Sequence, residues 1–94
     1  MRAEDLQGRW IHSHEEDTDD VMVFRHPEHE FPRSRGRQSI DLRADGSYAE
    51  RSPGPVDVPV ETTGKWRLAG ERLELEDQVW DLAGVSADRL TVRK

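Results

Sequence analysis

Apolar residues recur at every second position along most of this chain, which is the pattern of strands that bury one face. Alternating segments lie at 6–10, 39–43, 56–68, 73–75, 78–83 and 90–93, and a short apolar run lies at 21–24. Tyr48 continues the pattern after Asp45-Gly46, a pair that supplies the positive φ of a tight hairpin. The sequence therefore predicts about eight short strands.

The connections between these segments are short from Ala44 onward, and the longer ones lie at 15–20 and 26–36. Parallel strands need crossover helices of a dozen or more residues, so we expect an antiparallel, up-and-down meander. Glycine and proline interrupt each long helical candidate, and one helical turn fits in a loop. Closing the sheet into a barrel removes both exposed edges. A partly open barrel and a β-sandwich are the alternatives.

The first strand carries the tripeptide Gly8-Arg9-Trp10, and the last strand carries Arg93. In these residues, and in strand count and order, the chain resembles the lipocalin-like (calycin) proteins, in particular small barrels of bacterial type. The resemblance implies an all-β fold in which Trp10 closes the base of the barrel. It also implies that Arg93 packs across Trp10 in a cation–π contact.

The 94 residues fit a single domain, 1–94, because two half-size cores would each bury too little apolar surface. The net charge of −6 argues against nucleic acid and anionic membranes as partners. The chain has no cysteine, which excludes disulfides and thiolate metal sites and fits a reducing compartment. No apolar run is long enough for a signal peptide or a membrane span, so we expect a cytoplasmic protein.

All the histidines lie in the first third of the chain, close to several carboxylates. His12 and His14 are two apart on the first strand, so they share the face that Trp10 occupies, and both line the interior if Trp10 faces inward. Such a pair can offer two nitrogens to a divalent transition metal, and a further ligand would complete the site. The candidates for that ligand are Glu16, His26 and His29. The alternative is that the strand ends near His14 and that these are solvated polar residues of ordinary loops.

Two charged segments border these histidines. The acidic segment 15–20 lacks the glycine and the glutamate spacing of an EF-hand loop, so we interpret it as a solvated negative rim. The segment 31–37 holds Arg33, Arg35 and Arg37. Its arginines either grip an anionic group through bidentate contacts or pair with the acidic segment and pin a long loop.

Aromatic and histidine side chains are the candidate ligand-binding residues of the barrel interior. The set comprises Trp10, His12, His14, Tyr48 and Trp66. The alternative is that the aromatic rings simply fill a small core. No catalytic constellation stands out, because cysteine is absent and no glycine-rich phosphate loop precedes a helix.

Three hypotheses of function follow. The first is a lipocalin-like binding protein that holds a small, partly apolar ligand or docks a protein partner. The second is a metal-dependent site on His12 and His14 that binds or activates a small molecule inside the barrel. The third is a barrel that works as a homo-oligomer, burying sheet surface between subunits.

Overall fold

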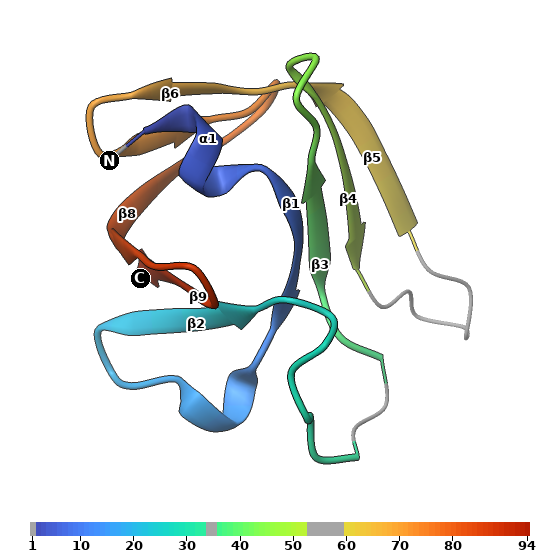
Figure 1. The fold of residues 1–94 in the computed structure, drawn as a ribbon, viewed down its shortest axis with the longest axis vertical. Helices are drawn as coiled ribbons and strands as arrows, with labels where there is room; N and C mark the ends of the chain where they lie inside the picture. The colour runs from blue at the N-terminus through green and yellow to red at the C-terminus, as the bar shows by residue number, and fades with distance from the viewer. Residues whose placement is uncertain (1, 34–35, 53–59) are drawn as a thin grey trace.

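Every strand pair in the described residues is antiparallel, and the strands form one nearly closed, barrel-shaped sheet (Figure 1). The computed structural model describes residues 2–33, 36–52 and 60–94. The strands are β1 (Gly8–His12), β2 (Val21–Arg25), β3 (Ser39–Leu42), β4 (Ser47–Ser52), β5 (Val60–Lys65), β6 (Arg67–Ala69), β7 (Arg72–Glu74), β8 (Val79–Val85) and β9 (Arg89–Arg93). A short helix, α1 (Ala3–Leu6), and a 3-10 turn, η1 (His14–Glu16), complete the elements. The predicted all-β antiparallel barrel is confirmed.

The order of strands departs from a simple up-and-down meander in one place. The order is β5-β4-β3-β1-β2-β9-β8-β7-β6, so β1 lies between β2 and β3, and β2 pairs with β9. The connection at 26–38 is long enough to carry the chain past β1 to its far side. The first strand is therefore a central strand of the barrel.

The barrel closes through a bend in one long segment at Trp66. The predicted strand at 56–68 is divided there, because β5 pairs with β4 whereas β6 pairs with β7. The Trp66 amide donates to the Gly46 carbonyl at 2.8 Å, and its indole Nε1 donates to the Arg43 carbonyl at 2.9 Å. β5 and β6, the strands at the two ends of this order, are thus consecutive in the chain. Val56 and Val58 of the predicted strand lie outside the described residues.

The predicted hairpin at Asp45-Gly46 joins β3 and β4. Gly46 has a φ of 90°, and the Arg43 amide donates to the Ser47 carbonyl at 2.9 Å. A positive φ of this kind is costly for residues with a side chain, so the glycine permits the tight turn. None of the helices in the described residues is long and apolar enough to cross a membrane.

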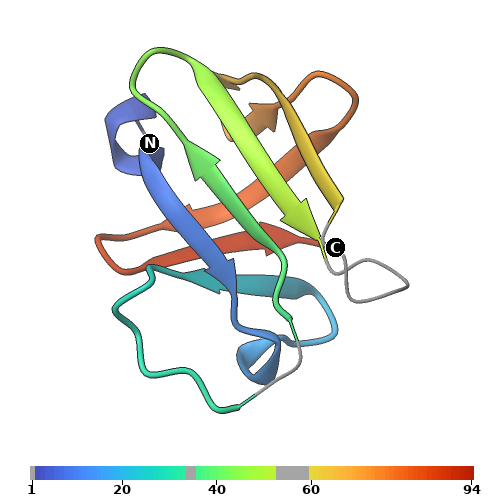
Figure 2. The same cartoon turned by 90° about the vertical axis from the view of Figure 1, so that its right-hand side faces the viewer.

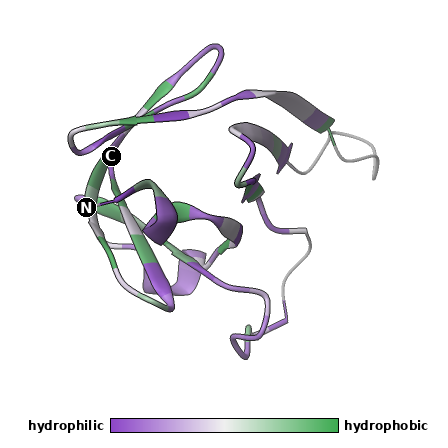
Figure 3. Ribbon diagram, turned by 45° about the horizontal axis from the view of Figure 1, so that its top comes forward, coloured by the Kyte–Doolittle hydropathy of each residue, from purple (hydrophilic) through white to green (hydrophobic). Residues whose placement is uncertain are grey.

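Side chains of the inward phase fill the interior of the barrel. Trp10, Phe24 and Tyr48 are each 0% exposed. Figure 3 shows hydrophobic and hydrophilic residues alternating along the strands, as expected when one face is buried. The core cluster comprises Leu6, Trp10, Phe24, Ile40, Leu42, Tyr48, Leu73, Leu75, Trp80, Leu82, Leu90 and Val92.

Four neighbouring strands, β1, β3, β4 and β5, form one wall of the barrel, which we call the four-strand wall. Figure 2 looks onto this wall, with β2, β9 and β8 crossing behind it. Because side chains alternate between faces, the polar phase of these strands points outward. The outer surface of the four-strand wall is therefore where its charged residues gather.

Candidate functional site

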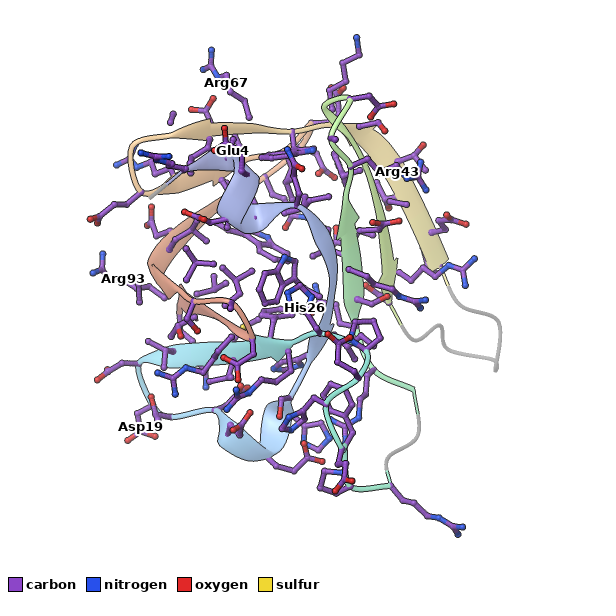
Figure 4. All side chains as sticks on the ribbon, in the orientation of Figure 1. Glu4, Asp19, His26, Arg43, Arg67 and Arg93 are labelled. Atoms are coloured by element: carbon purple, nitrogen blue, oxygen red, sulfur yellow. The ribbon has the colours of Figure 1, made fainter. Side chains whose placement is uncertain are left out.

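Trp10 is a core residue whose stacking partner is His26, not Arg93. The Trp10 and His26 rings lie 3.9 Å apart between centroids and 27° from parallel, and the Trp10 indole donates to the Leu6 carbonyl at 2.9 Å. Figure 4 shows Arg93 pointing away from the barrel. Val92 is buried, so alternation along β9 turns the next residue, Arg93, outward. The structure does not bring Trp10 and Arg93 together.

Gly8 makes room for the same imidazole. Its φ is +118°, and a Cβ at this position would lie 3.3 Å from Cε1 of His26. The Nδ1 of His26 donates to the Arg9 carbonyl at 2.9 Å, which fixes the ring. Gly8 and Trp10, the two ends of the Gly-x-Trp tripeptide, therefore form a slot for His26.

The two histidines of the first strand have different surroundings. β1 ends at His12, Ser13 is buried, and His14 begins η1 with a side chain that is 50% exposed. The His12 Nε2 lies 2.9 Å from Oδ2 of Asp17. The strand thus ends before His14, as the alternative interpretation proposed, and His14 does not line the interior.

The candidate metal ligands do not form a common site. Glu16 accepts hydrogen bonds from Arg25 at 2.7 and 2.9 Å, and the His29 ring packs edge-on against Phe31 at 4.8 Å between centroids. His26 lies against Trp10. In the part of the chain that the structure describes, no three His, Asp or Glu side chains are grouped to hold a metal ion.

Two ion pairs tie the long connections to the barrel, and we call Glu15, Glu16, Arg25 and Arg37 the loop clamp. Arg37 donates to both carboxylate oxygens of Glu15, at 2.6 and 2.8 Å. It also donates to the carbonyls of Pro32 and His12, at 2.6 and 3.0 Å.

The loop clamp supports the structural interpretation of the arginine segment. Arg37 pairs with the acidic segment and links Pro32 to η1. Arg33 is exposed, and Arg35 lies outside the described residues. One arginine of the segment therefore accounts for the predicted pinning of the loop.

The loop clamp also changes the acidity of its carboxyl groups. The hydrogen bond from Arg37 is the main reason that the pKa of Glu15 falls from 4.5 to about 2. The hydrogen bond from Arg25 likewise lowers the pKa of Glu16 to about 2. Both carboxyl groups therefore stay ionised well below the pH at which an ordinary glutamate is protonated.

A hollow of about 180 Å³ lies on the outer surface of the four-strand wall, and we call it the arginine hollow. Its floor contains Ser39 and Ala49, which are only 7% and 8% exposed. Around them stand Arg9, Arg43, Arg51, Asp41 and Glu61. Figure 4 shows Arg43 pointing outward from this wall.

The register of the strands explains this arrangement. In one row across the wall, Arg9 lies opposite Asp41, which lies opposite Ala49. In the next row, Ser39 lies opposite Arg51. Two small side chains on neighbouring strands therefore leave a depression, and the longer arginine side chains surround it.

The ion pairs in the arginine hollow are long. The Arg43 Nε lies 3.5 Å from Asp41 Oδ2, and the Arg51 Nη2 lies 3.7 Å from Glu61 Oε2. Arg9 forms no ion pair with any residue that the structure describes. Three guanidinium groups against two carboxylates make the hollow locally positive, although the chain has a net charge of −6.

Two other hollows have the opposite charge balance. One of about 400 Å³ lies beside α1 and includes Glu4, Asp5 and His26. Another, of about 560 Å³, lies on the outer face of β7 to β9, where carboxylates outnumber the arginines. Its lining comprises Ala69, Glu71, Arg72, Glu74, Asp81 and Arg93. Neither offers a positive site.

The residues of the arginine hollow were not among the sequence-based candidates. Of those candidates, Trp10 and Tyr48 are buried in the core, and Trp66 packs against the core with its indole bonded to Arg43. The sequence signal for the hollow was the set of outward-facing positions of the strands, where small and basic residues follow one another. Without the pairing of strands, that signal does not show which of these residues meet.

Comparisons of the chain with protein-family models, with curated proteins and with solved structures found no match. The functional conclusions therefore rest on the residues of this chain. The arrangement that carries them is the arginine hollow together with the filled interior.

Proposed function

We propose that this protein is a binding module that recognises its ligand or partner on the outer surface of the four-strand wall. The observation that carries this proposal is the arginine hollow, whose guanidinium groups have long ion pairs or none. Polar groups of this kind gain most from a partner that brings carboxylate or phosphate oxygens.

The filled interior supports recognition at the surface rather than inside the barrel. Trp10 and Tyr48 are fully buried, and the Phe24 and Trp80 rings stack at 5.3 Å between centroids. A partly apolar ligand in the interior would have to displace these close-packed side chains, which costs several kcal/mol in dense protein cores. The outer surface offers a site without that cost.

Binding also fits the described polar groups better than catalysis does. Ser13 has its hydroxyl bonded to Glu16, which in turn is held by Arg25. No base lies within hydrogen-bond distance of the Ser39 hydroxyl among the described residues. An activated serine needs such a base, so neither serine is a nucleophile in this arrangement.

We further propose that the protein is a compact cytoplasmic relative of the lipocalin-like barrels. The Gly8-Arg9-Trp10 tripeptide of β1 and the antiparallel barrel support the kinship, although the contact between Trp10 and Arg93 that the resemblance implies is absent. The absence of cysteine supports the compartment. The net charge of −6 disfavours nucleic acid and anionic membranes as partners. Sedimentation at low concentration tests the homo-oligomer hypothesis, because it shows whether a monomer persists.

The location of the site can be tested by thermal unfolding with a panel of anionic, cationic and apolar compounds. A ligand of the native state raises the midpoint by mass action. We expect that compounds which raise the midpoint lose this effect in the double variant Arg9→Gln and Arg51→Gln. The matched control, Arg72→Gln with Arg89→Gln, removes two exposed arginines elsewhere on the barrel and should keep the effect.

Two results would contradict the proposal. One is a midpoint that no compound raises in the unaltered protein. The other is an apolar compound that raises the midpoint equally in both double variants, because such a compound would bind inside the barrel.

A further inference from the structure

We propose that the arginine hollow is a site for one oxyanion group, a carboxylate or a phosphate, held by Arg9, Arg51 and the Ser39 hydroxyl. This inference rests on the proposed function and assigns a ligand chemistry to its site. The ligand is identified by its charged group, whether that group belongs to a small metabolite or to a free ion.

The Ser39 hydroxyl is the observation that points to a ligand. Ser39 is only 7% exposed, it lines the hollow, and its hydroxyl has no hydrogen-bond partner among the described residues. No side-chain nitrogen or oxygen of the described residues is buried without a partner, so this hydroxyl is accessible from the hollow. An acceptor oxygen placed in the hollow can therefore accept a hydrogen bond from this hydroxyl in place of solvent.

The strand register places two guanidinium groups around the same point. Arg51 lies directly across from Ser39 on β4. Arg9 of β1 lies opposite Asp41 of β3. Arg9 is therefore a diagonal neighbour of Ser39, on the side of β3 away from β4. An oxyanion above Ser39 would therefore have one arginine on each flank, in reach of the paired N–H groups that guanidinium offers.

The carboxylates of the hollow lie near its arginines without satisfying them. Asp41 and Glu61 lie 3.5 and 3.7 Å from guanidinium nitrogens, beyond the 2.7–2.9 Å that is usual for strong charged hydrogen bonds. An incoming oxyanion can therefore form shorter bonds to Arg51 than Glu61 does. Added salt should weaken the binding, because it screens the attraction between the oxyanion and the guanidinium groups.

The size of the hollow fits a single charged group. The volume of the hollow is about 180 Å³. Sites for drug-sized ligands are usually about 300–1,000 Å³. The hollow therefore suits a carboxylate or phosphate group, with the rest of any larger ligand lying across the wall.

The test is an NMR titration of the protein with sodium phosphate and, separately, sodium acetate, with sodium chloride holding the ionic strength constant. We expect saturable shifts that centre on the amides of Ser39 and Ala49 for at least one of the two probes. The comparison of the two probes shows whether phosphate or carboxylate is preferred.

Substitutions assign the contacts. Arg9→Gln and Arg51→Gln should each weaken the binding about tenfold, and Ser39→Ala about fivefold, as expected for hydrogen bonds to a charged group. The matched control Arg72→Gln removes an arginine from the outer face of β7 and should leave the affinity unchanged. The thermal midpoint of each variant shows that it remains folded.

Three results would overturn the inference: no saturable shift with either probe, shifts centred away from β3 and β4, or equal weakening by Arg72→Gln and Arg9→Gln. The last result would mean that only overall charge matters. If the inference fails but another compound still loses its effect in the double variant of Arg9 and Arg51, the proposed surface recognition stands with a different ligand.

Discussion

Arginine side chains face carboxylates in both the loop clamp and the arginine hollow, but at different distances and depths. In the loop clamp, the nitrogens of Arg25 and Arg37 lie 2.6–2.9 Å from glutamate oxygens, and these side chains are 16% and 10% exposed. In the arginine hollow, Arg43 and Arg51 lie 3.5 and 3.7 Å from their carboxylates and are 52% and 56% exposed.

The same residue types therefore serve two purposes in one small barrel. Short, bidentate, half-buried pairs hold two loops together, whereas long, exposed pairs contribute little to stability. The loop-clamp arginines are therefore structural, and the arginines of the hollow are available to a ligand.

The largest expected effect is on stability. Arg37→Ala removes the bonds to Glu15 and to the carbonyls of Pro32 and His12, so it should lower the free energy of unfolding by about 2 kcal/mol. The matched change in the hollow, Arg51→Ala, should lower it by less than about 0.5 kcal/mol. Denaturant unfolding measures both values. Equal losses of unfolding free energy in the two variants would show that the loop clamp and the arginine hollow contribute equally to stability.

The next effect is the dependence of stability on pH. The pKa values of Glu15 and Glu16 are lowered from 4.5 to about 2 in the folded state, so between these values the unfolded chain binds more protons. The stabilisation is therefore complete above pH 4.5 and is lost as the pH falls towards 2.

Unfolding free energies measured from pH 5 to pH 2 should reveal this loss, and Arg37→Ala should abolish the part that belongs to Glu15. Arg51→Ala should leave the pH dependence intact. If Arg37→Ala kept the full dependence, the ion pair with Glu15 would not be formed in solution.

The smallest effect compares two buried serines, one in each region. The Ser13 hydroxyl is bonded to Glu16, whereas the Ser39 hydroxyl has no described partner. Ser13→Ala should cost about 1 kcal/mol of stability, and Ser39→Ala should be close to neutral or slightly stabilising. Thermal midpoints measured in the absence of phosphate and acetate distinguish the two. A large loss in Ser39→Ala would mean that its hydroxyl is already satisfied.

The strands and turns of the barrel could be predicted from the alternation because each follows from local pattern. Ile40 and Leu42 mark the buried face of β3, and Asp45-Gly46 marks the turn after it. The order of the strands could not, because alternation shows which residues face inward but not which strand lies beside which. The central place of β1 and the bend at Trp66 both depend on those neighbours.

The candidate sites were predicted less well, for two physical reasons. Alternation holds only while a strand lasts, and β1 ends at His12, so the inward position expected for His14 was lost. The contact expected between Trp10 and Arg93 followed from the resemblance to the lipocalin-like proteins, whereas alternation with the buried Val92 turns Arg93 outward.

The stacking of His26 on Trp10 has no periodic signal, because His26 follows the last residue of β2. The arginine hollow depends on the register between paired strands, of which β1 and β3 are far apart in the sequence. Arg9 and Asp41 face each other across β1 and β3, and Ser39 and Arg51 face each other across β3 and β4. Such pairs emerge only once the register is known.

The most direct test of the distinction between the two regions is the mobility of the arginine side chains, measured by NMR relaxation at their Nε atoms. We expect Arg25 and Arg37 to have order parameters near those of rigid backbone, about 0.85, and Arg9 and Arg51 to lie below about 0.6. Equal order parameters in the loop clamp and the arginine hollow would contradict the account, because the arginines of the hollow would then be held as firmly as those of the clamp.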